Sequence, residues 1–523
     1  MSHGTNERRN EAAGVVSYYR GRGAWLLTAI AAAAVVYVTY LATHPYPAYA
    51  GGLYLDIAEH IIANDYALPE RIPGYTAEGV PFAYPPLLFY ATAVVHDLTG
   101  VDPVALTRFV PGIAVMAYLV PYYFIADELL DARYQAGLAT VLFAVTPTVL
   151  RWHLSAGGLV RAPAVLVMLT GVFFGLKLFR TGDRRWLLPA GVLFGLMVLS
   201  HPHYTVFFVL SYLLFFAFFD RTLGGLVNGA VVAAGGLVLA SPWWLQVVAT
   251  HGADIFLTAS GTHTGLGGGP YRLLDQFVYP LGDLDGEILF YVGAYLGAGY
   301  LLARRRYFLP AWMVAATYFI GKNRFLFVAG SMLTAVFVFE WLVPAAREHL
   351  PTLDRGRVVP VLTVLTVTLL ALTMGTLYGA SALNTAHEHS PTQPQYIDDH
   401  DVEAMQWMAA NTPEDAGFVV AGDAAEWVPV HTDRTILVGP WGWSGRTPVA
   451  TTTRSNATRT SPRARTRLAS PDTSRRPTSM PTTSTSRRAT TPSAGRSTSR
   501  TPGCGRRWRR PTGTRYATRT RAS

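Results

Sequence analysis

The sequence contains one cysteine and few charged residues, and both shortages exclude classes of protein. Cys504 is the only cysteine in 523 residues, so neither an intrachain disulfide nor a multi-cysteine metal site is possible. Charged residues make up 15% of the chain, whereas soluble globular domains have about a quarter. Half of the residues are hydrophobic, and the apolar runs recur at the length that crosses a bilayer. The composition therefore predicts an integral membrane protein.

Acids outnumber basic residues over residues 1–445 taken together, and the excess of basic residues lies at the C-terminal end. Residues 446–523 contain nineteen arginines and a single acid, Asp472. Taking these from the 43 basic and 33 acidic residues of the chain leaves 24 against 32, so residues 1–445 carry a net charge of −8. The end is rich in Thr, Ser, Pro and Arg and is predicted to be disordered. We favour a shifted reading frame as its origin, with a genuine disordered tail as the alternative.

Eleven apolar runs predict the fold class, an all-α polytopic membrane protein of about eleven transmembrane helices. The transmembrane domain covers residues 24–382, after a cytoplasmic N-terminus of residues 1–23. It is followed by the truncated start of a small extracytoplasmic α/β segment over residues 383–445. The predicted spans are 24–43, 106–129, 136–151, 162–180, 186–200, 204–219, 224–241, 287–303, 308–321, 324–343 and 358–380.

The arginines orient these spans, because cytoplasmic loops of membrane proteins are enriched in Lys and Arg. Four arginines before the first span predict a cytoplasmic N-terminus. A shorter run, 85–98, begins with two prolines and is ambiguous. If it lies at the membrane interface, the arginine clusters at 180–185, 304–306 and 347–357 are all cytoplasmic. The sequence therefore predicts a long first outer loop, 44–105, and an outer C-terminus.

An acid in this first outer loop is the first candidate for chemistry. Asp56 lies in "LYLDIAEHIIAND", whose pattern predicts an amphipathic helix with Glu59 and His60 on the same face. In glycosyl transfer from a lipid phosphate, a carboxylate at the membrane surface can remove the proton of the acceptor hydroxyl. The alternative is that these three side chains form the solvated face of the helix.

Cations at the outer ends of the spans are candidates for binding the phosphate of such a lipid. Arginine presents a planar pair of donors that matches phosphate oxygens. Arg324 opens a span two residues after Lys322, which makes it the best single candidate. The alternative is that each cation simply reaches the lipid headgroups. The candidates are Arg108, Arg151, Arg161, Lys322 and Arg324.

Histidines and acids on other outer loops raise the question of a metal. His201 and His203 in "SHPHY" are candidate substrate contacts, with metal binding and hydrogen bonding in a polar loop as alternatives. Asp283, Asp285 and Glu287 could hold a hard divalent ion, although the neighbouring glycines favour a solvated turn. No residue is assigned as a metal ligand, and no cofactor is assigned beyond a divalent metal as an alternative.

Three consecutive segments resemble a known superfamily. The loop "GGLYLDIAEH" is followed by "EGVPFAYPPLLFYATA" and then by "LTRFVPG" at the start of a span. This order resembles the GT-C superfamily of membrane glycosyltransferases, especially protein mannosyltransferases and lipid A aminoarabinose transferases. The segment "QWMAANTPEDAGFVVAGDAAEWVPVHTDRTILVG" is similar to the start of the outer domain of oligosaccharyltransferase catalytic subunits.

The resemblance implies a reaction centre. A carboxylate in the first outer loop maps onto Asp56, and a basic residue near the carrier phosphate maps onto Arg324. Many members have a second acid in the second outer loop, often beside a divalent metal, but "RWHLSAGGLVRAP" has none. Metal dependence therefore does not follow from the resemblance.

The predicted function is transfer of a sugar from a polyprenyl-phosphate carrier to a glycan, protein or lipid acceptor at the outer face of the cell membrane. Membrane lipid is an expected partner and nucleic acid is not. One alternative is a GT-C-like protein without catalysis. The other is a transporter or lipid flippase, which would predict internal repeats and charges near mid-membrane; no clear repeat is seen, and the span centres are almost free of charge.

Overall fold

The structure is a computed structural model, and it describes residues 3–47, 51–261, 269–282, 287–349, 358–382, 397–420 and 423–436. The predicted disordered tail, 446–523, lies outside the described residues, as do Asp283 and Asp285. The predictions made for these residues stay predictions.

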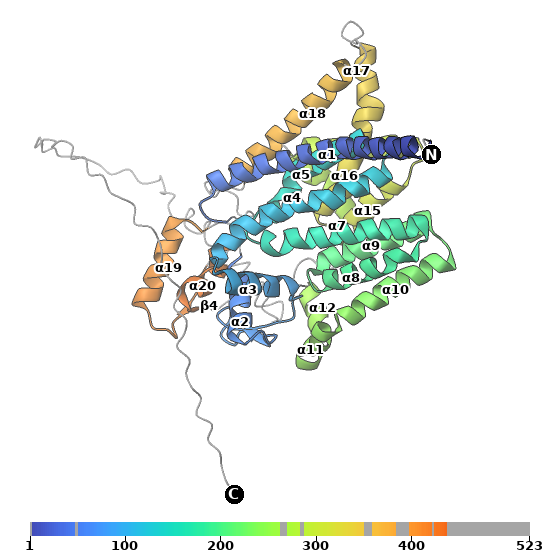
Figure 1. Cartoon of the computed structure of the whole chain (residues 1–523). Helices are drawn as coiled ribbons and strands as arrows, with labels where there is room; N and C mark the ends of the chain where they lie inside the picture. Colours follow the sequence, from blue (N-terminus) through green and yellow to red (C-terminus); the bar gives the residue numbers. More distant parts are fainter. Residues whose placement is uncertain are drawn as a thin grey trace, which may run out of the picture. The chain divides into compact units, whose positions relative to one another are not determined.

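Helices dominate the described residues (Figure 1). Six are long and apolar enough to cross a bilayer, and a helix pair bent by 61° at Ala240 makes a seventh if it is counted as one broken span. The six are α1 (His3–Thr43), α4 (Pro103–Leu129), α7 (Gly158–Thr181), α9 (Pro202–Phe219), α16 (Asn323–Phe337) with its continuation, and α18 (Val358–Leu377). The bent pair is α10 (Leu223–Leu239) and α11 (Ser241–His251). α16 continues through the π-helical turn η2 (Val338–Leu342) into α17 (Val343–His349), and α18 ends in a second such turn, η3 (Tyr378–Ala382).

The other predicted spans are shorter helices. They are α5 (Arg133–Val145), α8 (Leu187–Val198), α14 (Ile288–Ala303) and α15 (Phe308–Ile320), with η1 (Arg184–Trp186) before α8. After Thr146 the chain starts a separate helix, α6 (Pro147–His153), because Pro147 has no N–H to continue the hydrogen bonds of α5. Every predicted span thus contains a helix, and the mostly helical, polytopic membrane fold is confirmed. The number eleven, and the side of the membrane on which each terminus lies, stay predictions.

Glycines allow the central helices to approach closely. A β-carbon on Gly171 of α7 would lie 2.2 Å from the ring of Phe208 on α9, and one on Gly175 would lie 2.3 Å from the ring of Tyr212. The Tyr212 hydroxyl donates to the carbonyl of Gly171 at 2.8 Å. Small residues at such contacts are typical of membrane helix packing. They fix α7 against α9, whose first turns carry candidate site residues.

The predicted first outer loop is a packed unit rather than an open loop. It contains α2 (Gly52–Ala63), the antiparallel strands β1 (Arg71–Ile72) and β2 (Val80–Pro81), and α3 (Leu87–Thr99). α2 packs against α3. The helix predicted over 85–98 is present as α3, while its position at the interface stays a prediction. Eight of the twelve residues of α2 are buried, Asp56 among them, so the solvated-face alternative does not hold for Asp56.

The last described segment packs onto this loop. α19 (Asp399–Asn411) begins with a capping box at Asp398 and ends before Pro413. β3 (Gly417–Phe418) pairs in parallel with β4 (Thr435–Ile436), and η4 (Asp423–Glu426) and α20 (Val428–Thr432) lie between them in the chain. The two strands have only two residues each. α20 contacts α2, which in turn packs against α3 (Figure 1).

Two further helices, α12 (Asp254–Gly261) and α13 (Pro270–Gly282), lie in the predicted fourth outer loop. α13 packs against α15. It exposes the apolar side chains of Tyr271, Leu274 and Val278 and buries the polar side chains of Arg272 and Gln276. Its polar face is therefore turned toward the protein, next to the turn between α15 and α16.

Candidate functional site

Asp56 lies in the middle of α2 with its side chain buried. The residue is 9% exposed, and its Oδ2 atom accepts no hydrogen bond among the described residues. Its nearest charged partner is His60, one turn further along, with Nε2 3.7 Å from Oδ2. Burial raises the pKa of Asp56 well above its usual range, and the carboxylates of Glu59 and Asp433 raise it further. The group therefore holds its proton more tightly than an exposed aspartate does.

Glu59 and His60 share this environment. Burial, together with the charges of Asp433 and Asp102, raises the pKa of Glu59 to about 7. Burial lowers the pKa of His60, and Asp433 opposes that change. We call Asp56, Glu59 and Asp433 the acid side of the site. The like charges of this side raise the pKa of Asp56 and of Glu59.

The C-terminal segment holds α2 in place. A β-carbon on Gly52 would lie 2.0 Å from the carbonyl oxygen of Glu426, so only glycine permits this approach of the two backbones. The Tyr75 hydroxyl donates to the same carbonyl at 3.1 Å. The backbone N–H of Ile436 donates to the carbonyl of Gly74 at 2.8 Å. Residues 423–436 therefore cover the first turn of α2 and the turn between β1 and β2.

Three of the predicted phosphate-binding cations gather at the ends of neighbouring helices. Arg161 lies in the first turn of α7, Arg324 is the second residue of α16, and Lys322 directly precedes α16. Arg161 and Arg324 are close enough to repel each other, and both act on Lys322. Burial, then Arg324, Arg272 and Arg161, lower the pKa of Lys322 to about 8. We call Arg161, Lys322 and Arg324 the cation side.

Aromatic rings lie against two of these cations. The guanidinium of Arg161 lies 5.1 Å from the ring centroid of Trp152, and that of Arg324 lies 5.4 Å from the ring centroid of Tyr204. Arg324 is 8% exposed, and its Nε has no hydrogen-bond partner among the described residues. Within the described part of the chain, none of the three cations forms an ion pair with a carboxylate. A buried cation without an acidic partner is costly unless an anion binds to it.

Tyrosines and histidines complete the cation side, and the sequence did not single out the tyrosines. The Tyr204 hydroxyl lies 2.8 Å from Nε2 of His153, whose Nδ1 lies 3.4 Å from the Tyr118 hydroxyl. Tyr54, Tyr84 and Tyr204 all act electrostatically on Arg161. The available signal was position, because Tyr204 follows "SHPH" at the start of a span and Tyr54 lies two residues before Asp56.

The predicted histidines lie at the same edge. His201 is 5% exposed, and its ring lies edge-on to Tyr204 at 4.7 Å and to Tyr84 at 5.8 Å. Its Nδ1 accepts from the backbone N–H of His203 at 3.3 Å, so His201 caps α9. The His203 ring lies 5.7 Å from that of His201. Both histidines are thus beside the cation side, and His201 has a capping role there.

Tyr54 joins the two sides. Arg161 donates from Nη2 to the Tyr54 hydroxyl at 3.3 Å, and Tyr54 and Asp56 belong to the same turn of α2. Residues two apart on a helix point in different directions. The charged groups that act on Asp56 are accordingly Glu59 and Asp433 rather than the arginines. The Tyr54 hydroxyl thus connects α2, which carries the predicted acid, to one of the predicted cations.

Two predicted cations have other contacts. Arg108 donates from Nη2 to the carbonyl of His44 at 3.0 Å and to that of Leu41 at 3.4 Å, where α1 ends. Arg151 donates from Nε to the Tyr378 hydroxyl at 2.6 Å. Arg108 therefore satisfies carbonyls that a helix end leaves without partners. Neither contact involves the cation side.

The described residues do not supply a complete metal site. No group of three or more His, Cys, Asp or Glu side chains that could hold an ion occurs among them. Asp56 and His60 form only a pair. Glu287, the described member of the predicted acidic cluster, is 1% exposed and accepts from the Thr148 hydroxyl at 2.5 Å. We therefore route no step through a metal.

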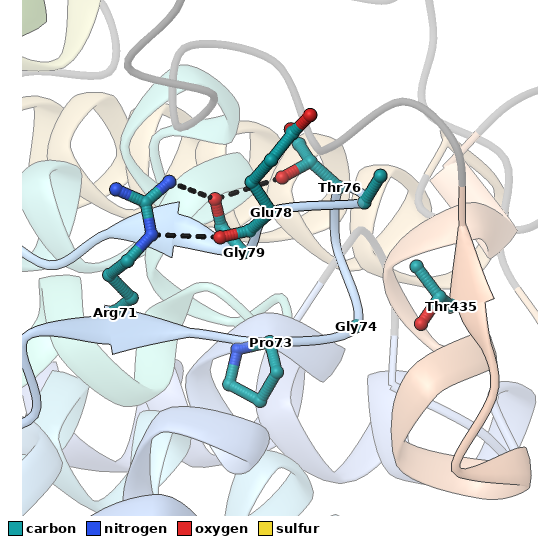
Figure 2. Close-up of a pocket in the computed structure, with 8 residues that line it drawn as sticks. Arg71, Pro73, Gly74, Thr76, Glu78, Gly79 and Thr435 are labelled. Atoms are coloured by element: carbon teal, nitrogen blue, oxygen red, sulfur yellow. Dashed lines mark hydrogen bonds between the residues drawn. The ribbon is translucent and has the colours of Figure 1, made fainter. Parts of the chain in front are cut away.

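Figure 2 shows a pocket of ≈ 340 Å³ beside the β1–β2 turn. Arg71 donates to the carbonyls of Glu78 at 2.8 Å and Gly79 at 2.7 Å, and the Thr76 hydroxyl donates to the latter at 2.9 Å. The guanidinium thus closes the turn, and no residue of the acid or cation side lines the pocket. The lining residues are Arg71, Pro73, Gly74, Thr76, Ala77, Glu78, Gly79 and Thr435.

Comparison with known families and sequences gives one partial match. Residues 83–245 match the family described as dolichyl-phosphate-mannose-protein mannosyltransferase. No curated protein matches the sequence.

Solved structures of two membrane enzymes are similar to this chain. The Archaeoglobus fulgidus oligosaccharyltransferase in the apo form has a TM-score of 0.53 and 14% identity, over 80% of this chain and 64% of that one. The complex of the archaeal oligosaccharyltransferase AglB from Archaeoglobus fulgidus with an inhibitory peptide and a dolichol-phosphate has a TM-score of 0.54 and 15% identity. The match covers 80% of this chain and 64% of that one. ArnT from Cupriavidus metallidurans bound to undecaprenyl phosphate has a TM-score of 0.54 and 14% identity. The match covers 79% of this chain and 85% of that one. The chain thus spans less than two thirds of the archaeal enzyme's length, and identities this low show the fold alone.

Proposed function

We propose that this chain, which has the fold of the GT-C superfamily of membrane glycosyltransferases, transfers a sugar from a polyprenyl-phosphate carrier to an acceptor. The acceptor is a glycan, protein or lipid at the outer face of the membrane. The observation that carries the proposal is the cation side, where Arg161, Lys322 and Arg324 gather without a paired carboxylate. This arrangement suits a phosphate group at the membrane surface. Two of the similar structures were solved with a dolichol-phosphate or undecaprenyl phosphate.

The proposed chemistry is a direct displacement. A carboxylate takes the proton of the acceptor hydroxyl while the acceptor oxygen forms a bond to the anomeric carbon. The bond from that carbon to the phosphate oxygen breaks, and the phosphate leaves with the electron pair. Arg161 and Arg324 stabilise the negative charge that develops on the phosphate. Asp56 is the carboxylate that the sequence selects for the first step. Glu59 and His60 on the same helix, and His201 and His203 beside the cation side, are candidate substrate contacts.

The test is a transfer assay. Membranes containing the wild-type chain or one of two variants, Arg324→Ala and Asp56→Asn, are supplied with a radiolabelled polyprenyl-phosphate sugar, and label in glycan, protein and lipid fractions is measured. We expect Arg324→Ala to lower transfer at limiting donor. The matched control is Arg304→Ala, which removes an exposed arginine from the turn between α14 and α15. If the wild type transfers label and Arg324→Ala transfers as much at limiting donor, the cation side does not take part in transfer.

A second candidate function is binding of polyprenyl phosphate without transfer. The environment of Asp56 favours it, because burial and the charges of Glu59 and Asp433 raise the pKa of Asp56 and so disfavour the ionised form that a general base needs. This candidate predicts saturable binding of the lipid phosphate by the wild type, loss of binding in Arg324→Ala, and no transfer of label to any fraction.

A further inference from the structure

The guanidinium of Arg324 lies against two aromatic rings. Its central carbon is 5.4 Å from the ring centroid of Tyr204 and 5.2 Å from that of Phe325. The two rings pack against each other, with their centroids 5.0 Å apart. An arginine that lies over an aromatic face keeps the N–H donors of its plane available for an anion. The placement of the Tyr204 ring therefore helps to set the direction in which Arg324 presents these donors.

The Tyr204 ring is in turn held by two histidines. The ring of His201 lies edge-on to it at 4.7 Å, and its hydroxyl lies 2.8 Å from Nε2 of His153. Tyr204 is 1% exposed and His153 is 2% exposed. A buried tyrosine hydroxyl needs a hydrogen-bond partner, and the imidazole of His153 supplies one. This hydrogen bond fixes the end of the ring that lies furthest from the backbone.

His153 itself is fixed from two directions. Its Nδ1 lies 3.4 Å from the Tyr118 hydroxyl of α4. A β-carbon on Gly158, where α7 begins, would lie 2.3 Å from the carbonyl oxygen of His153, so the two backbones are in close contact. The preceding residue, Trp152, lies 5.1 Å from the guanidinium of Arg161. Consecutive residues of α6 therefore serve the two arginines of the cation side.

We infer that His153 is a positioning residue of the phosphate site, because through the Tyr204 hydroxyl it holds the ring on which Arg324 lies. The inference rests on the proposed function, since it assigns the phosphate of the polyprenyl carrier to Arg324. His153 does not touch the phosphate and exchanges no proton with the substrate. Its removal leaves the charge of Arg324 in place but releases the ring that directs the guanidinium.

Affinity for undecaprenyl phosphate in nanodiscs tests this role. His153→Leu and Tyr204→Phe remove the same hydrogen bond, so each should weaken binding about 2- to 30-fold, the range for loss of one cation–π contact. The double variant should bind as each single variant does, because there is only one hydrogen bond to lose. His153→Gln should recover most of the affinity, since its amide oxygen can accept from the hydroxyl.

Tyr122→Phe is the matched control. It removes another buried tyrosine hydroxyl, which donates to the carbonyl of Val328 at 3.0 Å, and Val328 belongs to the same helix as Arg324. The unfolding temperature should fall in this variant as it does in His153→Leu, while the affinity for undecaprenyl phosphate stays at the wild-type value. A loss of affinity as large as that in His153→Leu would overturn the inference, because any buried hydrogen bond near α16 would then have the same effect.

The outcomes separate this inference from the proposed function. Wild-type affinity in His153→Leu and Tyr204→Phe overturns the inference and leaves the proposed transfer as it stands. A double variant that binds more weakly than both single variants also overturns it, as does a folded His153→Gln that binds no better than His153→Leu. If His153→Leu does not fold, Tyr204→Phe decides alone, because it keeps the ring and removes only the hydroxyl. If the wild type binds undecaprenyl phosphate but transfers no label, the proposed transfer fails and the binding results still decide the inference. A wild type that does not bind this lipid overturns both.

Discussion

The acid side and the cation side of the site both bring like charges together, but they can respond to that repulsion in different ways. Asp56 and Glu59 can take up protons, and the pKa of each is raised, that of Glu59 to about 7. Arg161 and Arg324 cannot lose their protons at any pH that a folded protein tolerates. The acid side therefore relieves its repulsion without a ligand. The cation side needs an anion, and this difference makes it the better indicator of a ligand.

The two sides also differ in the parts of the chain that build them. Asp56 lies under a backbone contact between Gly52 and Glu426, so the acid side depends on a segment far away in sequence. The cation side is built from the first turns of α7 and α16 and the rings of Trp152 and Tyr204. Ligand binding to the cations should therefore survive disturbances that alter the acid side.

The largest effect that we expect is from removing a buried guanidinium. Arg324→Ala should weaken binding of undecaprenyl phosphate about 10- to 150-fold, since a hydrogen bond to a charged group contributes about 1.5–3 kcal/mol. Arg324→Lys should recover part of this, because the charge stays but the planar fork is lost. Binding to nanodiscs measures both. Equal affinities for wild type and Arg324→Ala would show that the cation side does not hold the phosphate.

A substitution at Gly52 should separate the two sides. In Gly52→Ala the new methyl group meets the carbonyl of Glu426, and the strain should cost about 1–3 kcal/mol of stability. Limited proteolysis of residues 423–436 should become faster, while the affinity for undecaprenyl phosphate should fall less than in Arg324→Ala, because α2 reaches Arg161 through the Tyr54 hydroxyl. Gly235→Ala is the control, since a β-carbon there meets nothing within 4 Å. Proteolysis as slow as in the control would contradict the close contact.

The sequence predicted the helices better than the site. The spans follow from apolar runs, and the stop of α19 before Pro413 follows from local chemistry that acts within a few residues. Arg161, Lys322 and Arg324 could be selected because cations at span ends are few. The direction of Asp56 could not be predicted, since it depends on how α2 packs under residues that come 370 positions later.

A smaller effect is expected from removing one charge of the acid side. Asp433→Asn takes a negative charge away from Asp56 and Glu59, so the pKa of each should fall toward its usual value. With the pKa of Glu59 raised from 4.5 to about 7, the folded state binds more protons than the unfolded state between these values. Stability should therefore fall as pH rises from about 4.5 to 7. Asp433→Asn should flatten this slope, as measured by unfolding temperature against pH. An identical slope would mean that Asp433 does not act on these acids.

The smallest effect is expected on the cation side, at alkaline pH. The pKa of Lys322 is lowered to about 8 by burial and by Arg324, Arg272 and Arg161, so a rise through pH 8 should remove its charge and weaken phosphate binding a few-fold. Arg272 of α13 donates to the carbonyl of Phe319 at 3.3 Å, and Gln276 donates to Asn323 at 2.6 Å. α13 thus braces the turn that carries Lys322.

Arg272→Gln should raise the pH at which phosphate binding weakens. Removing a like charge stabilises the protonated amine, so the pKa of Lys322 should rise and the alkaline loss of binding should move to higher pH. Below pH 7 the affinity for undecaprenyl phosphate should change little. Lys322→Gln supplies the reference, because it should abolish the pH-dependent step altogether. If the step persists in Lys322→Gln, another group titrates there, and the cation side then consists of the two arginines alone.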